Sequence, residues 1–137
     1  MRRSIKVLGH QAGVTVIEFA IIAPLLFLLI FAIIEGGRVF SAWLIITNEA
    51  REGARYGVVR HGDPARGPTL VGDTKAHVES RIASQLDPGN MAVNVRLTGD
   101  PAVSVTVDYS VDIITPLIQS LVPNPFPLRA ISVMRAE

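Results

Sequence analysis

Residues 14–34 read VTVIEFAIIAPLLFLLIFAII, which is the strongest structural signal in the 137-residue chain. It contains one charged residue, Glu18, and residues 19–34 carry no charge. At ~1.5 Å per residue, a helix of this length spans roughly 30 Å, which is about the thickness of the hydrocarbon core of a bilayer. The sequence therefore predicts a membrane-spanning helix over residues 14–34.

The residues before this stretch indicate its orientation. Arg2, Arg3 and Lys6 lie in residues 1–13 with no acid, whereas residues 14–137 hold ten basic and twelve acidic residues. The positive-inside rule then places the N-terminus in the cytoplasm and residues 35–137 on the other side. A removable signal peptide is the rival interpretation, but it needs a shorter apolar stretch and a small-residue cleavage site, which Glu35-Gly36-Gly37 does not supply.

The overall composition excludes several classes of protein. Hydrophobic residues make up 49% of the chain and charged residues 18%, which is too apolar for a disordered chain. There is no cysteine, which rules out disulfides, cysteine-ligated zinc and a cysteine nucleophile. The net charge of +1 gives no reason to expect a nucleic-acid partner.

Two residues inside the apolar stretch are unusual. Pro24 removes a backbone hydrogen bond and should kink or loosen the helix. A carboxylate such as Glu18 costs about 2.5–3.5 kcal/mol inside an apolar span, so it either has a partner or lies near the lipid headgroups.

The residues around Glu18 favour a partner. Gly13 ends the basic head, Glu18 lies five positions after it, and Phe19 follows Glu18. This resembles the cleavage site of type IV-like prepilins, in which a membrane peptidase cuts after glycine; the leader would be residues 1–13 and the mature chain would begin at Val14. The cut would create an ammonium group on Val14, which could pair with Glu18 of a neighbouring chain shifted by about one helical turn. Glu18 would then set the register between packed helices.

A wider set of residues resembles the TadE-like family, minor pseudopilins of the bacterial tight-adherence (Flp-type) pilus system. The resemblance covers residues 11–57 and rests on Glu18-Phe19-Ala20, Pro24-Leu25-Leu26, the segment 35–38 and the segment 48–56. Phe19 follows the acid where the major pilins of this system tend to carry Tyr, which favours the minor class.

The resemblance implies four kinds of partner: a prepilin peptidase, the major Flp-type pilin with other minor pseudopilins, an inner-membrane assembly platform, and membrane lipid. It also implies location in the bacterial inner membrane with a periplasmic outer domain, or incorporation in an extracellular pilus.

The helix should continue over residues 35–60. Gly36 and Gly37 are weak points, each costing ~1 kcal/mol relative to Ala, so a hinge is expected there. Apolar and small residues then recur at helical spacing, and this stripe should pack on the chain's own sheet or on a partner helix. The expected packing residues are Trp43, Ala50, Gly53, Ala54 and Gly57. The charged residues of segment 49–55 predict a structural charge network on other faces, which could also contact neighbouring subunits.

Residues 61–137 predict a small outer domain. A Gly- and Pro-rich loop precedes a helix capped by Asp73 or Thr74 and ending near residue 86. Alternating residues predict strands over 91–97 and 103–113, paired antiparallel through a short turn, and a third strand over 128–135. The prolines of segment 116–127 should prevent regular pairing there. The expected fold is α+β: a long N-terminal membrane-spanning helix that continues into a second helix on a three-stranded antiparallel sheet.

The sequence gives little support for an enzyme. The histidines show no metal-ligand spacing, and no serine or glycine pattern resembles a nucleophile elbow or a phosphate loop. We therefore expect no catalysis and no cofactor. The predicted function is a minor pseudopilin that initiates, caps or supports a pilus; the alternatives are an uncleaved single-pass anchored binding domain of unknown ligand and a membrane-anchored enzyme.

Overall fold

The computed structural model describes residues 10–61, 67, 69–98 and 102–135, and their side chains from residue 13 onward. Its elements follow in the order α1 (His10–His61), α2 (Leu70–Ala83), a single 3-10 turn η1 (Pro88–Asn90), β1 (Met91–Leu97), β2 (Ala102–Val111), α3 (Pro116–Gln119) and β3 (Phe126–Arg135). The fold is α+β, as predicted.

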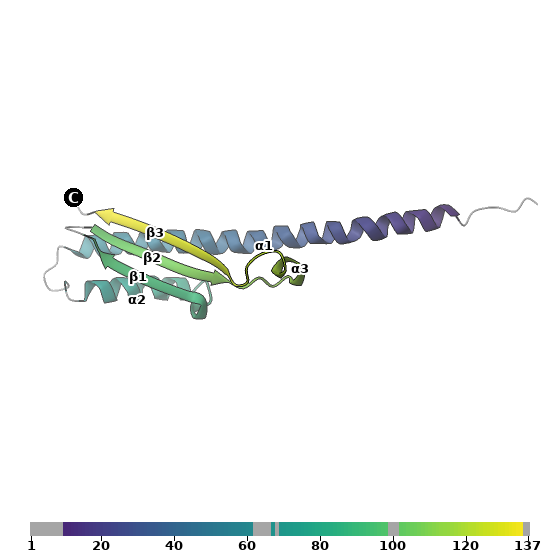
Figure 1. The fold of residues 1–137 in the computed structure, drawn as a ribbon. Coiled ribbons are helices and arrows are strands. Elements are labelled where there is room, and N and C mark those ends of the chain that lie inside the picture. The colour runs from purple at the N-terminus through teal and green to yellow at the C-terminus, as the bar shows by residue number, and fades with distance from the viewer. Residues whose placement is uncertain (1–9, 62–66, 68, 99–101, 136–137) are drawn as a thin grey trace, which may run out of the picture.

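Helix α1 dominates the shape of the molecule. It is one helix of 52 residues that runs through Pro24, Gly36 and Gly37. Its C-terminal half lies along the sheet beside α2, whereas its N-terminal half projects beyond the rest of the fold (Figure 1). A hinge at the two glycines stays a prediction, since the helix is unbroken there.

The three strands form one antiparallel sheet in the order β1-β2-β3. In this register Met91 of β1 faces Tyr109 of β2, and Asp108 of β2 faces Arg129 of β3. Side chains of β2 alternate between buried and half-buried, so one face of the sheet packs on the helices and the other carries the polar residues. The alternation that the sequence predicted is therefore present in the central strand.

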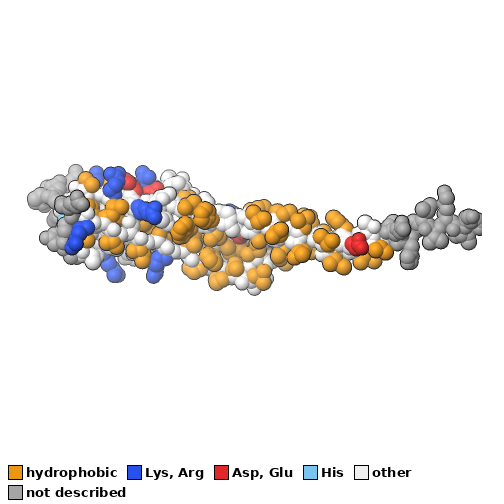
Figure 2. Space-filling view, turned by 90° about the horizontal axis from the view of Figure 1, so that it is seen from above, with side chains coloured by type: hydrophobic (Ala, Val, Ile, Leu, Met, Phe, Trp, Pro, Cys, Tyr) orange, Lys and Arg blue, Asp and Glu red, His pale blue; other side chains and the backbone are white. Residues whose placement is uncertain are grey.

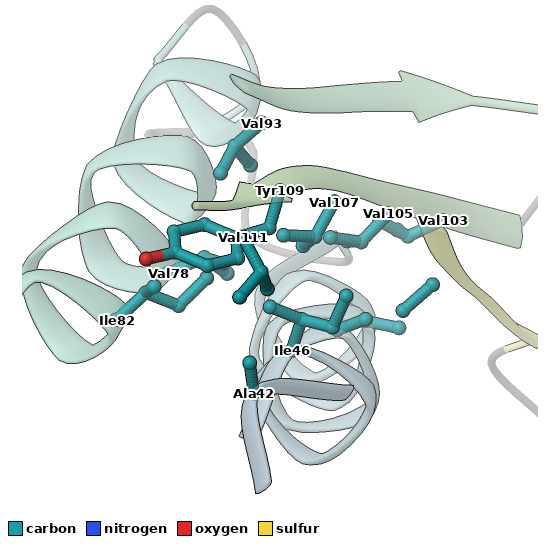
Figure 3. Packing of buried hydrophobic residues seen from close by; sticks show 13 residues of the cluster. Ala42, Ile46, Val78, Ile82, Val93, Val103, Val105, Val107, Tyr109 and Val111 are labelled. Atoms are coloured by element: carbon teal, nitrogen blue, oxygen red, sulfur yellow. The ribbon is translucent and has the colours of Figure 1, made fainter. Parts of the chain in front are cut away.

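The hydrophobic core lies between α1, α2 and the buried face of the sheet (Figure 3). Its centre is made of valines from β2 packed against isoleucines and alanines of the helices. The fully buried side chains are Ile46, Ala54, Val78, Ile82, Val103, Val105 and Val107. Apolar area removed from water is worth about 25 cal/mol per Å², so this cluster is the main source of the outer domain's stability.

Two details of the predicted elements are wrong. The cap of α2 is Thr69 rather than Asp73 or Thr74, and Thr74 is fully buried inside the helix. The helix begins earlier because buried Leu70 anchors its first turn and the Thr69 carbonyl accepts the Asp73 amide at 2.8 Å. Pro127 lies inside β3, opposite Ser110, because β3 is an edge strand and one of its sides needs no ladder hydrogen bond.

Candidate functional site: the exposed apolar helix and its junction with the outer domain

The N-terminal half of α1 presents apolar side chains outward in every direction. Figure 2 shows hydrophobic side chains covering this half and continuing onto the adjoining end of the outer domain. The exposed fraction reaches 70% at Phe19 and 71% at Ile21. By length and composition this helix can cross a membrane, and among the residues that the structure describes it is the one that can. A continuous apolar surface of this size is unfavourable in water, so α1 fits membrane anchoring.

The residues around the predicted cleavage point lie on this helix. Gly13 and Val14 are within α1, and the space next to Gly13 is open, because a Cβ built there would meet nothing within 4 Å. Glu18 and Phe19 follow on the same helix, and both side chains are exposed. The leader that was predicted over residues 1–13 lies mostly outside the described residues. Cleavage and the role of Glu18 stay predictions.

A second carboxylate, which the sequence analysis did not single out as functional, lies at the junction of α1 with the outer domain. Glu35 is 4% exposed although it directly follows the apolar stretch. Its carboxylate accepts hydrogen bonds from Arg38 at 2.5 Å, from the Ile114 amide at 3.4 Å and from the Thr115 hydroxyl at 3.2 Å. The Arg38 guanidinium also donates to the Asp112 carbonyl at 3.4 Å. Glu35 and Arg38 thus hold the loop after β2 against α1.

The signal for this junction was present in the sequence but ambiguous. A charged residue one position after an apolar run reads as the ordinary end of a membrane span, where the side chain faces water. Its burial depends on a loop almost eighty residues later in the chain, which sequence spacing does not predict.

The predicted helix-packing residues lie mostly on the buried side of α1. Ala50 and Ala54 are at most 1% exposed, and Gly53 and Gly57 are buried against Val78 and strand β2. Trp43 differs, because it is 42% exposed and stacks on Phe40. At that turn the buried side chain is Ala42, so the stripe packs on the chain's own sheet and Trp43 lies at its edge.

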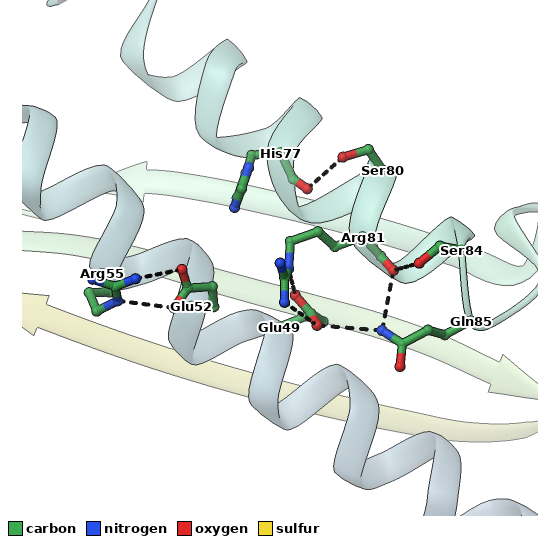
Figure 4. A network of polar contacts seen from close by, with 8 residues as sticks. All are labelled: Glu49, Glu52, Arg55, His77, Ser80, Arg81, Ser84 and Gln85. Atoms are coloured by element: carbon green, nitrogen blue, oxygen red, sulfur yellow. Dashed lines mark hydrogen bonds and ion pairs between the residues drawn. The ribbon is translucent and has the colours of Figure 1, made fainter.

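The charged residues of the C-terminal half of α1 form intrachain pairs (Figure 4). The Arg55 guanidinium donates two hydrogen bonds to Glu52, at 3.0 and 2.8 Å, and lowers the pKa of that carboxyl. Glu49, which was expected to belong to a structural charge network, is 5% exposed and accepts hydrogen bonds from Arg81 of α2 at 2.5 and 3.2 Å. This ion pair connects α1 with α2. It also supplies the buried Glu49 carboxylate with the partner that a buried charge needs.

Comparison with known proteins supports the interpretation of α1. Residues 13–55 match the family described as TadE-like protein. We found no match among curated proteins and none among solved structures. The matched segment contains the exposed apolar half of α1, Glu35 and most of the buried stripe, so its C-terminal part is integrated in the core of the outer domain. Residues 13–55 are thus similar to the TadE-like family, and this similarity supports an involvement in a tight-adherence pilus system.

Proposed function

We propose that this chain is a minor pseudopilin of a tight-adherence pilus, anchored in the inner membrane by residues 14–34 with its N-terminus cytoplasmic and its outer domain periplasmic. A prepilin peptidase would cut between Gly13 and Val14. The mature helix would then pack laterally with the major pilin and with other minor pseudopilins, so that the chain initiates, caps or supports the pilus. This role is mechanical and requires no catalysis and no cofactor.

The observation that carries the proposal is the exposed apolar surface of α1 with one carboxylate near its start. Glu18 is exposed in the isolated chain, so the helix itself does not bury this charge. In a bilayer the charge would be costly without a partner. A new α-ammonium on Val14 of a neighbouring chain would supply that partner, and the pairing would fix how far adjacent helices are shifted along their axes.

The proposal is tested by mass spectrometry and N-terminal sequencing of the protein from cells with and without the peptidase. We expect a chain that begins at Val14 only when the peptidase is present. A functional protein that keeps residues 1–13 would contradict the proposal and leave an uncleaved anchored domain.

The role of Glu18 is tested separately by Glu18→Gln, which keeps the shape of the side chain but removes its charge. We expect pilus assembly, measured as sheared surface pilin, to fall sharply, even for the fraction of the protein that the peptidase has cleaved. Glu79→Gln on α2 is the matched control, because it makes the same chemical change outside the membrane helix, at a half-buried carboxylate that lies 3.7 Å from the Lys75 ammonium. Equal assembly by both variants would refute the pairing.

A further inference from the structure

Helix α3 and the loops on either side of it lie beside the middle of α1, beyond the end of the sheet, where the apolar stretch of residues 14–34 meets the outer domain (Figure 1). Residues 113–128 read IITPLIQSLVPNPFPL, sixteen residues with no charged side chain. In a periplasmic loop of a chain whose outer domain is otherwise rich in charge, this composition is unusual. The loop also exposes large apolar side chains, with Ile114 at 66%, Leu117 at 56% and Leu121 at 71%.

An apolar groove of about 530 Å³ separates this loop from α1. Its wall on α1 runs from Leu28 and Ala32, inside the predicted span, to Trp43, and its other wall includes Ile118 and Leu121. Leu28 lies seven residues before Glu35, which is ~10 Å along the helix axis. The loop therefore reaches back beside residues that the apolar stretch places in the bilayer.

We propose that the loop of residues 113–128, which includes α3 and the first residues of β3, dips into the outer leaflet of the membrane and that lipid acyl chains fill the groove between this loop and α1. The occupant is lipid because the groove is continuous with the apolar surface of α1, which lipid must already cover. A depth of ~10 Å is the depth to which apolar faces enter the interface between headgroups and acyl chains.

The contacts of Glu35 agree with this placement. A carboxylate at the border of the hydrocarbon needs donors that do not come from water. The loop supplies two of them, the Ile114 amide and the Thr115 hydroxyl, and Arg38 supplies a third. Glu35 itself lines the groove, so the loop supplies the donors that its carboxylate needs beside lipid, while the outward apolar side chains of the loop face lipid. Phe40 and Trp43, at the outer end of the groove, fit the aromatic belt at the headgroup level.

The inference needs α1 to lie in a bilayer, but it does not depend on cleavage or on pilus assembly. It also has a mechanical consequence. With both helix α1 and the loop of residues 113–128 in the membrane, the outer domain would be held at a fixed height and could not rotate about the axis of α1. With α1 alone in the membrane, the outer domain could rotate about that axis.

The test uses the full-length chain in phosphatidylcholine vesicles. Because the sequence has no cysteine, single cysteines can be introduced and labelled with an environment-sensitive fluorophore. The probe site is Leu121→Cys, and Ile131→Cys on β3, 62% exposed, is the matched apolar control outside the loop. Phe27→Cys marks α1 itself. Lipids brominated on their acyl chains quench a label only where it contacts them.

We expect the labels at positions 27 and 121 to lose most of their emission in brominated lipid and the label at position 131 to keep it. If position 27 is quenched and position 121 behaves like position 131, the loop lies in water and the proposal is overturned. If the label at position 27 is not quenched, α1 does not lie in the bilayer, and both the membrane anchor and this proposal are overturned. If quenching at position 121 appears only at low protein-to-lipid ratio, while at high ratio the site is shielded from lipid, the groove prefers a second copy of the chain and the proposal is also overturned.

The unmodified chain provides a second measurement. Trp43 is the single tryptophan in the sequence and lines the groove. Its emission should be quenched more by lipids brominated near the headgroup than by lipids brominated near the chain end. Emission that neither lipid quenches would contradict a lipid-filled groove without any substitution in the protein.

Discussion

Substitution of Gly53 by Ala tests the close approach on which the core depends. A Cβ added at Gly53 would overlap Val78 Cγ2 of α2 and would lie 3.5 Å from Val105 Cγ1 of β2. Val78 is fully buried, and a β-branched side chain in a helix has essentially one favourable rotamer, so it cannot turn away. Helix α2 must therefore move away from α1.

The expected free energy follows from two opposing effects. Overpacking of a core costs about 1–3 kcal/mol, and the rigid Val78 places this site at the upper end of that range. Replacing glycine by alanine in a helix interior returns ~1 kcal/mol. The net loss is about 2 kcal/mol, which corresponds to a decrease in Tm of about 10 °C for an outer domain of this size.

The measurement is thermal unfolding of the full chain in detergent, followed by near-ultraviolet circular dichroism. Gly72→Ala is the matched control, because Gly72 lies in α2 and a Cβ there would meet nothing within 4 Å. We expect this control to melt at or above the wild-type temperature. If Gly53→Ala were as stable as Gly72→Ala, the close contact between α1 and α2 would not exist as described.

Three further predictions concern the core, the acid range and the junction. Val105→Ala removes a fully buried side chain and should cost about 2–3 kcal/mol in urea unfolding, whereas Val133→Ala, at 59% exposure, should stay within ~0.5 kcal/mol. Because the Arg55 hydrogen bond lowers the pKa of Glu52 from its ordinary value of 4.5, the pair's stabilisation is complete above that value and is lost as pH falls through the lowered pKa. Glu52→Gln should therefore weaken the acid-side fall in unfolding free energy, and an unchanged pH profile would show that the pair contributes nothing. Glu35→Ala leaves partly buried donors of the loop after β2 without an acceptor, so amide hydrogen exchange in that loop should accelerate more than in Glu35→Gln. Exchange in both variants at the wild-type rate would mean that Glu35 does not hold the loop.

The elements that the sequence predicted well are those whose signal is local. The apolar length of residues 14–34 predicts a long helix, and period-two alternation predicts β1 and β2 almost to the residue. The predicted start of α2 and the predicted exclusion of Pro127 from the third strand were wrong, because Leu70 is fixed by burial and Pro127 is tolerated at a sheet edge. Both depend on neighbours that the local sequence does not reveal.

The amino-acid sequence alone predicts the anchor: an apolar helix with a basic head, and a glycine and a carboxylate inside the segment that matches the TadE-like family. The environment of two other carboxylates, Glu35 and Glu49, became clear only from the packed fold. Glu49 pairs with Arg81, and Glu35 accepts hydrogen bonds from a loop that follows it by almost eighty residues. The periodicity of a sequence predicts which face of a helix or strand is apolar. A buried charge needs a partner, and the identity of that partner is fixed only when the helices and the sheet pack together.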